Sequence, residues 1–409
     1  MSANEPTNRI VYVTRDIERA LGVLPNDNYM IVSNKTSYSE KILKNLNNTN
    51  NSIGNNILLI ENATILDTAE LLEQNKVRDY INQNDSTVLV FKNTSLIEDI
   101  VKKNGWNLLN PPSTLAEKYE NKITQVEWLG ELAKYLPPHS ISLAKNLKWS
   151  DQPIVVQWAH GHTGDGTILV NSQKELDTIQ AKFPERLARA TTFINGPSFT
   201  VNMVVAPNTI LIGNISYQIT GLPPFTDNRF STIGNDWGKI VPALLNKSEV
   251  EYIHQIAREI GEKMHKDGWK GLFGIDIIKE EKTGKIFLIE INARQPASTT
   301  FESQLQSRYG GQTSVFEAHL LALQDIQIER PIIEIEEGAQ IIQRVTKDIT
   351  NISKSVIDSL ESSGYNVIAY SNTEINSDLV RIHSNKGIIS KHNQFNEAGE
   401  KIRACIIGK

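Results

Sequence analysis

The segment LIEINARQ, residues 288–295, constrains the fold more than any other stretch of the chain. Its apolar residues are typical of a buried strand, but Glu290, Asn292 and Arg294 occupy every second position. Side chains two residues apart in a strand point to the same face. We therefore predict a strand with a carboxylate, an amide and a guanidinium in one row, a set of groups that an ordinary core strand does not need.

The segment before it, GLFGIDIIKEEKTGKIFLIEIN (271–292), has two apolar runs around a turn composition and predicts a β-hairpin. A three-residue loop at 282–284, with Gly284 in the left-handed conformation, would pair Glu281 with Lys285. Counting back along both strands from this pair places Asp276 directly opposite Glu290.

Two facing carboxylates repel each other unless they share a proton or bind a cation. Together with the amide oxygen of Asn292, Asp276 and Glu290 offer the hard oxygen ligands that Mg²⁺ accepts. The alternative is a solvated hairpin face without a ligand. It is disfavoured because Arg294 continues the polar row and because a glycine-rich loop occurs elsewhere in the chain.

This loop lies in QWAHGHTGDGTILV (157–170) and contains Gly161, Thr163, Gly164, Gly166 and Thr167. Successive free backbone N–H groups in such a turn can form a nest for phosphate. The order is strand–loop–strand, which excludes a Walker loop and a dinucleotide fingerprint, because both continue into a helix. A plain hairpin tip would look similar, so the loop alone is weak evidence. His160 and His162 lack a third histidine or cysteine nearby and do not predict a metal site.

A glycine-rich strand–loop–strand followed some 110 residues later by a D…E-x-N-x-R hairpin resembles the ATP-grasp superfamily. The resemblance covers roughly residues 113–325, and IEINARQPAS (289–298) is similar to its E-x-N-x-R signature. It implies one or two Mg²⁺ ions, or Mn²⁺, held by Asp276, Glu290 and Asn292 against the phosphates of ATP. It also implies catalytic roles for Arg294, facing the transferred phosphoryl group, and for Lys122, the early lysine that reaches the phosphates. The nucleotide itself is expected to contact Lys122, Gln157, Gly161, His162, Thr163, Gly164, Asp165, Gly166, Thr167, Phe193 and Ile194, the last two at the adenine hinge.

The chain departs from the family pattern in the strand before the loop. Relatives usually have a lysine there, whereas this chain has Gln157, which can donate a hydrogen bond but carries no charge. Thr191, Thr192 and Ser198 stand where the hinge often has acidic residues. On the sequence alone, Gln157→Lys is expected to strengthen ATP binding.

Short β-branched runs at 9–14, 29–34, 56–61 and 87–92 alternate with helical patterns at 39–46 and 68–81, which predicts a parallel sheet. The predicted fold is α/β and α+β: a Rossmann-like pre-ATP-grasp domain (1–112), an ATP-grasp domain (113–330) and a small C-terminal α+β domain (331–409). The second domain is predicted to divide into a glycine-rich-loop part (113–190) and a metal-hairpin part (191–330). An Asn-rich loop is expected at 45–56, and an aperiodic substrate-specificity loop at 216–238, with Asp227, Arg229 and Asp236.

Composition adds mainly exclusions. The net charge of −5, with lysine and arginine spread along the 409 residues, argues against a broad nucleic-acid surface. A single cysteine, Cys405, allows no disulfide within the chain. The N-terminal residues lack a signal-peptide pattern, and no apolar run approaches the ~20 residues of a membrane helix. We expect a cytoplasmic protein with small-molecule partners and no nucleic-acid or membrane partner; a homodimer is compatible with the sequence.

The expected activity is an ADP-forming ligase that activates a carboxylate as an acyl-phosphate and joins it to an amine or similar nucleophile. Alternatives are a bicarbonate-phosphorylating carboxylase or carbamoyl-phosphate-type enzyme, a small-molecule kinase, and a nucleotide-binding regulator without catalysis. The complete row of Asp276, Glu290, Asn292 and Arg294 disfavours the last.

Overall fold

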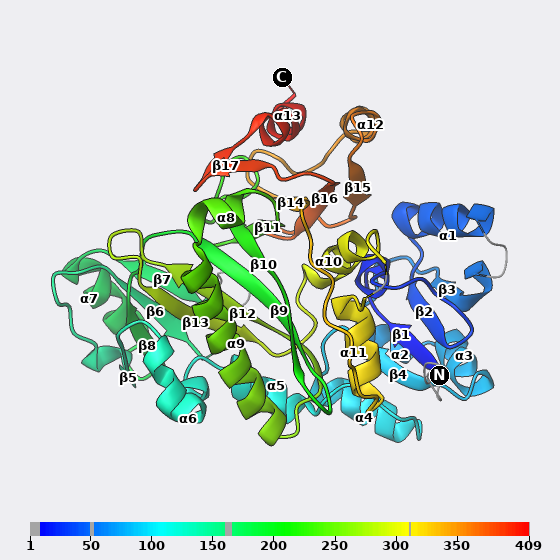
Figure 1. The fold of residues 1–409 in the computed structure, drawn as a ribbon, viewed down its shortest axis with the longest axis horizontal. Helices are drawn as coiled ribbons and strands as arrows, with labels where there is room; N and C mark the ends of the chain where they lie inside the picture. The colour runs from blue at the N-terminus through cyan, green and yellow to red at the C-terminus, as the bar shows by residue number, and fades with distance from the viewer. Residues whose placement is uncertain (1–8, 50–52, 160–165, 311, 409) are drawn as a thin grey trace.

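The computed structural model describes residues 9–49, 53–159, 166–310 and 312–408. Three sheets organise this part of the chain (Figure 1): a parallel sheet near the N-terminus, a four-stranded antiparallel sheet, and an eight-stranded sheet between them. The C-terminal elements lie together at the top of the view.

The parallel sheet has the strand order β3-β2-β1-β4. Its strands, β1 (Ile10–Val13), β2 (Tyr29–Asn34), β3 (Ile57–Ile60) and β4 (Thr87–Val90), confirm the four strands and the parallel arrangement predicted from the sequence. The strands are mostly buried, since helices α1 (Ser37–Thr49), α2 (Thr68–Leu72), α3 (Asn75–Gln83) and α4 (Ser95–Lys103) accompany them.

Two local predictions in this region are wrong. The helical pattern at 68–81 forms two helices, because Gln74 between them takes an extended conformation. The expected loop at 45–56 is largely helical where it is described: α1 continues through Leu46, which packs against the core, and a 3₁₀ helix spans Ile53–Asn56. Residues 50–52 lie outside the described part.

The four-stranded antiparallel sheet has the order β5-β8-β6-β7. It consists of β5 (His139–Leu143), β6 (Ile154–Trp158), β7 (Thr167–Val170) and β8 (Leu187–Thr192), packed against α7 (Gln173–Lys182). Helices α5 (Ser113–Glu120) and α6 (Thr124–Leu129) precede it. β6 and β7 pair directly, so the glycine-rich segment joins two strands of one hairpin, as predicted.

The central sheet has the order β13-β12-β9-β10-β11-β14-β16-β15. Five of its strands are β9 (Ser198–Val205), β10 (Ile210–Thr220), β11 (Thr232–Asp236), β12 (Gly271–Lys279) and β13 (Ile286–Asn292). The other three, β14 (Ala339–Arg344), β15 (Asn366–Ala369) and β16 (Asp378–Ser384), come from the C-terminal segment and continue the sheet through the β11–β14 pair. One hydrophobic core therefore joins residues from both sides of position 330.

Helices cover the central sheet. The longest, α9 (Lys247–Lys266), begins with a capping box at Asn246 and Glu249 and buries Ile253, Ile256 and Ile260. The others are α8 (Ile240–Leu244), α10 (Thr299–Gln306), α11 (Val315–Leu323), α12 (Lys354–Ser362) and α13 (Glu397–Ile406), with a small hairpin of β17 (Ile389–Lys391) and β18 (Gln394–Phe395). No helix within the described ranges is both long and apolar enough to cross a membrane.

The expected loop at 216–238 is partly strand, because β10 runs to Thr220 and β11 begins at Thr232, and residues 221–231 between them form a loop. The pattern is aperiodic because residues on both faces of these strands are buried. Asp236 has a structural role: its carboxylate accepts hydrogen bonds from the backbone N–H groups of Gly238, Ile388 and Ile389. Asp227 similarly accepts from the backbone N–H of Lys347.

Candidate active site

The hairpin of β12 and β13 brings the predicted carboxylates face to face. Asp276 pairs with Glu290, as predicted, although the expected three-residue loop is wrong. The N–H of Glu280 bonds to the carbonyl of Lys285 at 2.8 Å, and Lys279 pairs with Ile286, so the loop has one residue more. A β-bulge between Asp276 and Ile277 shifts the register back, and Gly284 has the expected positive φ of +71°.

Asp276 is buried, and its carboxylate accepts hydrogen bonds from two neighbouring side chains. Thr200 Oγ1 donates a hydrogen bond to Asp276 Oδ1 at 2.8 Å, and Asn292 Nδ2 donates to Oδ2 at 3.3 Å. Burial, followed by the charge of Glu290, raises the pKa of Asp276 to about 6. An added cation would relieve this repulsion between two carboxylates.

Glu290 forms an ion pair with Lys122, whose Nζ lies 2.6 Å from Glu290 Oε1. Burial opposes ionisation of Glu290, but Lys122 and Arg294 together hold its pKa below the usual value. The backbone N–H of Lys122 bonds to the carbonyl of Ala159 at 3.0 Å, which fixes the lysine beside the start of the glycine-rich segment. The structure thus brings Lys122 close to Glu290 and Arg294, two residues that were predicted from a motif far along the chain.

Arg294 lies at the other side of Glu290 and contacts a residue that sequence reasoning missed. Its Nη1 is 2.5 Å from Glu120 Oε1 and donates to Asn292 Oδ1 at 2.9 Å. Lys92 Nζ lies 3.0 Å from the other oxygen of Glu120. Burial raises the pKa of Glu120, but Arg294 and Lys92 outweigh it and lower the pKa overall. The only sequence signal for Glu120 was its place two residues before Lys122.

The donor set suits a divalent cation with oxygen preference. Within the described ranges no group of three or more His, Cys, Asp and Glu side chains could hold a metal, and the hairpin offers two facing carboxylates. Mg²⁺ commonly takes one or two carboxylates and completes its shell with water and phosphate. Asn292, the expected third ligand, turns its amino group to Asp276 and its oxygen to Arg294. Asp276 and Glu290 therefore fit such an ion best.

A cavity of 230 Å³ lies between the two antiparallel sheets, and we call it the main cavity. One end is apolar and includes both predicted hinge residues, Phe193 and Ile194. Gly196 follows them with φ +154°, and a Cβ there would lie 2.0 Å from the carbonyl oxygen of Lys279, so glycine is required for this approach. The other end is polar and is lined by Lys122, Gln157, Thr167, Arg189, Asp276 and Glu290.

Arg189 in this cavity was also missed by sequence reasoning. It lies on β8 directly opposite Gln157 on β6, and its Nη2 donates to Gln157 Oε1 at 2.8 Å. Its side chain is buried, 2% of the residue being exposed. A lone arginine between Ala188 and Ala190 was the available signal, but only the strand register shows what it faces.

The glycine-rich segment is described only at its end. Gly166 has φ +86°, a conformation that favours glycine, and Thr167 begins β7 and lines the main cavity. The predicted nucleotide contacts Gly161, His162, Thr163, Gly164 and Asp165 lie outside the described residues, as does His160.

A second cavity of 310 Å³, here the adjoining cavity, shares Gln218, Thr232, Asp276 and Glu290 with the main cavity. Its lining includes Arg19, Arg294, Arg344 and Arg381, and we call the side formed by these residues with Asp378 its wall. Asp378 pairs with both Arg344, at 2.9 Å, and Arg381, at 3.0 Å. The wall therefore has more cationic than anionic groups.

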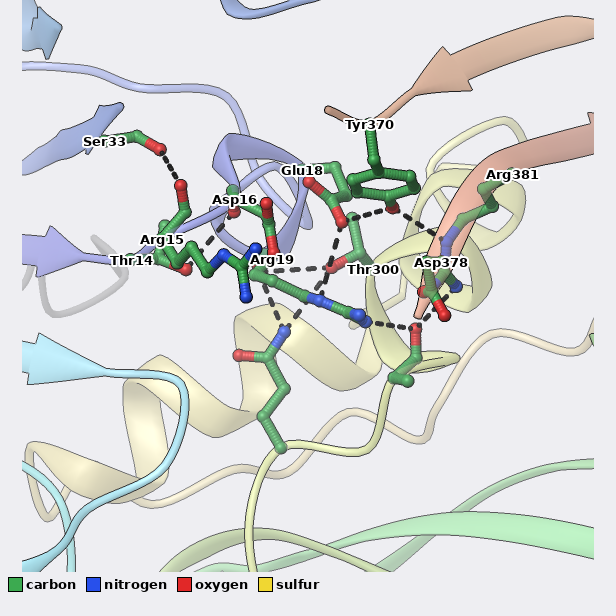
Figure 2. A network of polar contacts seen from close by, with 12 residues as sticks. Thr14, Arg15, Asp16, Glu18, Arg19, Ser33, Thr300, Tyr370, Asp378 and Arg381 are labelled. Atoms are coloured by element: carbon green, nitrogen blue, oxygen red, sulfur yellow. Dashed lines mark hydrogen bonds and ion pairs between the residues drawn. The ribbon is translucent and has the colours of Figure 1, made fainter. Parts of the chain in front are cut away.

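Figure 2 shows how this wall is held. Arg381 Nε donates to the hydroxyl oxygen of Tyr370 at 3.1 Å, and Tyr370 donates to Glu18 Oε1 at 2.6 Å. Arg19 Nη1 donates to the carbonyl oxygen of Ala297 at 3.1 Å. The segment after β1, the segment after β13 and the C-terminal strands thus meet at one side of the site.

Comparison with known proteins identifies the class. Residues 119–298 match the family model of the ATP-grasp domain, and the structure has the ATP-grasp fold. Residues 119–298 therefore form an ATP-grasp domain. A search of the curated proteins finds no significant sequence match.

Three solved structures resemble it over nearly their full length, and at their low identity they show the fold alone. N5-carboxyaminoimidazole synthetase from Staphylococcus aureus has a TM-score of 0.63 at 14% identity, covering 98% of both chains. L-amino acid ligase from Bacillus licheniformis has 0.64 at 13%, again with 98% of each chain covered. N5-carboxyaminoimidazole synthase from Aspergillus clavatus, in complex with ADP and 5-aminoimidazole ribonucleotide, has 0.62 at 14%, covering 98% of this chain and 97% of that chain.

Proposed function

We propose that the protein is an ATP- and Mg²⁺-dependent ligase that activates a carboxylate as an acyl-phosphate and joins it to an amine. The observation that carries the proposal is the position of Asp276 and Glu290, which line both the main cavity and the adjoining cavity. Phosphoryl transfer needs a nucleotide on one side of such a cation site and an acceptor on the other. The two cavities provide these two spaces.

The groups around the junction suit this chemistry. The main cavity offers an apolar end for a base and Lys122 and Arg189 for phosphates. Bound between Asp276 and Glu290, Mg²⁺ would neutralise charge on the transferred phosphoryl group. The arginines of the adjoining cavity would bind an anionic acceptor, and a carboxylate is the simplest such group.

In the proposed reaction, a carboxylate oxygen attacks the γ-phosphorus and ADP leaves. The amine nitrogen then attacks the carbonyl carbon of the acyl-phosphate, phosphate leaves, and the nitrogen loses a proton. Arg294, fixed by Glu120 and Asn292, would face the carboxylate in the first step and the leaving phosphate in the second. Under this proposal the nucleotide contacts are Lys122, Gln157, Thr167, Phe193 and Ile194, with the glycine-rich segment, and the domain boundaries remain those proposed above.

The test is a screen of carboxylates and amines for the release of ADP and phosphate in proportion to ligated product. Glu290→Gln serves as the inactive control. AMP and pyrophosphate in place of ADP and phosphate would contradict the proposal, because they indicate adenylation.

A second candidate is a carboxylase that phosphorylates bicarbonate, whose CO₂⁻ group resembles that of a carboxylate. The full-length likeness to proteins named N5-carboxyaminoimidazole synthetase favours it. Incorporation of ¹³C from labelled bicarbonate into an amine, dependent on ATP, would support the carboxylase. ADP release that requires an organic acid and is unaffected by removal of bicarbonate would support the ligase.

A further inference from the structure

The polar end of the main cavity contains a buried cation without a buried anion of its own. The hydrogen-bond acceptors of Arg189 among the described residues are the side-chain oxygens of Gln157 and Gln125 and, at 3.5 Å, the backbone carbonyl of Ile289. All are uncharged. A buried guanidinium that lacks an anionic partner is costly, so its retention at a cavity wall calls for an anion that arrives with a ligand.

The strand register makes the position of this arginine specific. Gln157 and Arg189 are paired residues on β6 and β8, and both line the main cavity. Gln157 is uncharged, but its Oε1 accepts from both Nε, at 3.2 Å, and Nη2, at 2.8 Å, of Arg189. The glutamine therefore holds the guanidinium plane, while Gln125 holds Nη1 at 3.0 Å from the other side.

We propose that Arg189 binds the phosphates of the nucleotide, with Gln157 as its positioning residue, so that the cationic group comes from β8 and not from β6. This inference rests on the proposed function, because it concerns the nucleotide of the same site. Lys122, held by Glu290, supplies a second cation at the same end of the cavity. Burial lowers the pKa of Arg189 to about 10, against the opposing effect of Glu290, so the guanidinium stays charged at neutral pH.

The arrangement also changes the expectation for Gln157→Lys. In the structure, a lysine at 157 would bring an ammonium group against the Arg189 guanidinium and remove its main acceptor. The single variant should therefore bind nucleotide more weakly than the wild type. The double variant Gln157→Lys/Arg189→Gln, which exchanges the two residue types across the strand pair, should recover binding.

The experiment is isothermal titration of the full chain with Mg²⁺ and a non-hydrolysable ATP analogue, with ADP, and with adenosine, which lacks phosphate. Arg189→Gln should weaken binding of both phosphorylated ligands by roughly ten- to a hundredfold, the range for lost charge-assisted hydrogen bonds. Binding of adenosine should change less than twofold. Arg186→Gln is the matched control, because Arg186 is exposed one residue before β8 and does not line the cavity.

Equal affinity of wild type and Arg189→Gln for the ATP analogue would overturn the inference, and so would a parallel loss of adenosine binding, which indicates a structural role. If Arg189→Gln does not fold, the double variant Gln157→Lys/Arg189→Gln provides the test. An affinity for the ATP analogue within tenfold of the wild type supports the inference. A double variant that folds but binds the analogue more weakly than this overturns the inference. If the wild type binds no nucleotide, the proposed function is overturned together with the inference. If the wild type binds nucleotide and Arg189→Gln binds it equally well, only the inference is overturned.

Discussion

Asp276→Asn is expected to stabilise the protein at neutral and alkaline pH while removing the proposed Mg²⁺ site. In the wild type, burial and the nearby Glu290 raise the pKa of Asp276 from 3.8 to about 6. The stability that this carboxyl contributes is thus fully present below about pH 4 and is lost as the pH rises through 6. Asparagine carries no charge at any pH, and its side-chain oxygen can still accept the hydrogen bond from Thr200.

The magnitude follows from the shift. About two pKa units correspond to about 3 kcal/mol at pH 8, where the wild-type carboxylate is ionised, and to about half of that at pH 5. In the absence of Mg²⁺, the free energy of unfolding of Asp276→Asn should exceed that of the wild type by up to this amount at pH 8. Added Mg²⁺ should narrow the difference, because it binds the folded wild type and not the variant.

Urea unfolding followed by tryptophan fluorescence, at pH 5 and pH 8 and with and without Mg²⁺, measures these differences. Asp358→Asn is the matched control, because Asp358 is an exposed aspartate on α12. It should leave the stability unchanged under all four conditions. An Asp276→Asn variant less stable than the wild type at pH 8 without Mg²⁺, or a difference that does not grow with pH, would refute the reasoning.

Three further predictions concern the cation site and its neighbours. Glu290→Gln should abolish Mg²⁺-dependent turnover with little change in the urea midpoint, because the side chain faces the cavities; ordinary turnover with ordinary Mg²⁺ dependence would exclude Glu290 as a ligand. Lys122→Met should lower nucleotide affinity at least about tenfold in titration. The control Lys134→Met, at an exposed lysine, should leave the affinity unchanged, and an equal loss in both variants would contradict a specific role of Lys122. Arg294→Lys should reduce turnover but not the affinity for ADP, because Arg294 lines the adjoining cavity. Equal losses of turnover and ADP affinity would argue against separate cavities for the acceptor and the nucleotide.

Much of the site could be predicted because it follows from local periodicity. The alternation in LIEINARQ and the hairpin composition before it were enough to place Asp276 opposite Glu290. The predicted pairing of Asp276 with Glu290 is correct although the turn is longer than expected and the strand pair contains a β-bulge. The longer turn and the bulge shift the register in opposite directions and so cancel. Turn length and bulges depend on packing around the hairpin, which residue patterns describe poorly. Phe193 and Ile194 were predicted as hinge residues from the family resemblance, and both line the main cavity.

The sequence by itself determined the elements that depend on neighbouring residues: the strands of the parallel sheet, the strand–loop–strand unit and the polar row on β13. Only the tertiary structure decided which distant side chains meet: Lys122 with Glu290, Glu120 with Lys92 and Arg294, and Arg189 with Gln157. It also joined the C-terminal strands to the central sheet through the β11–β14 pair, a long-range pairing that local residue patterns do not predict. The physical reason is that strand pairing and buried charge depend on contacts between segments far apart in the chain. A residue such as Gln157 therefore acquires its role from the arginine that the neighbouring strand places beside it.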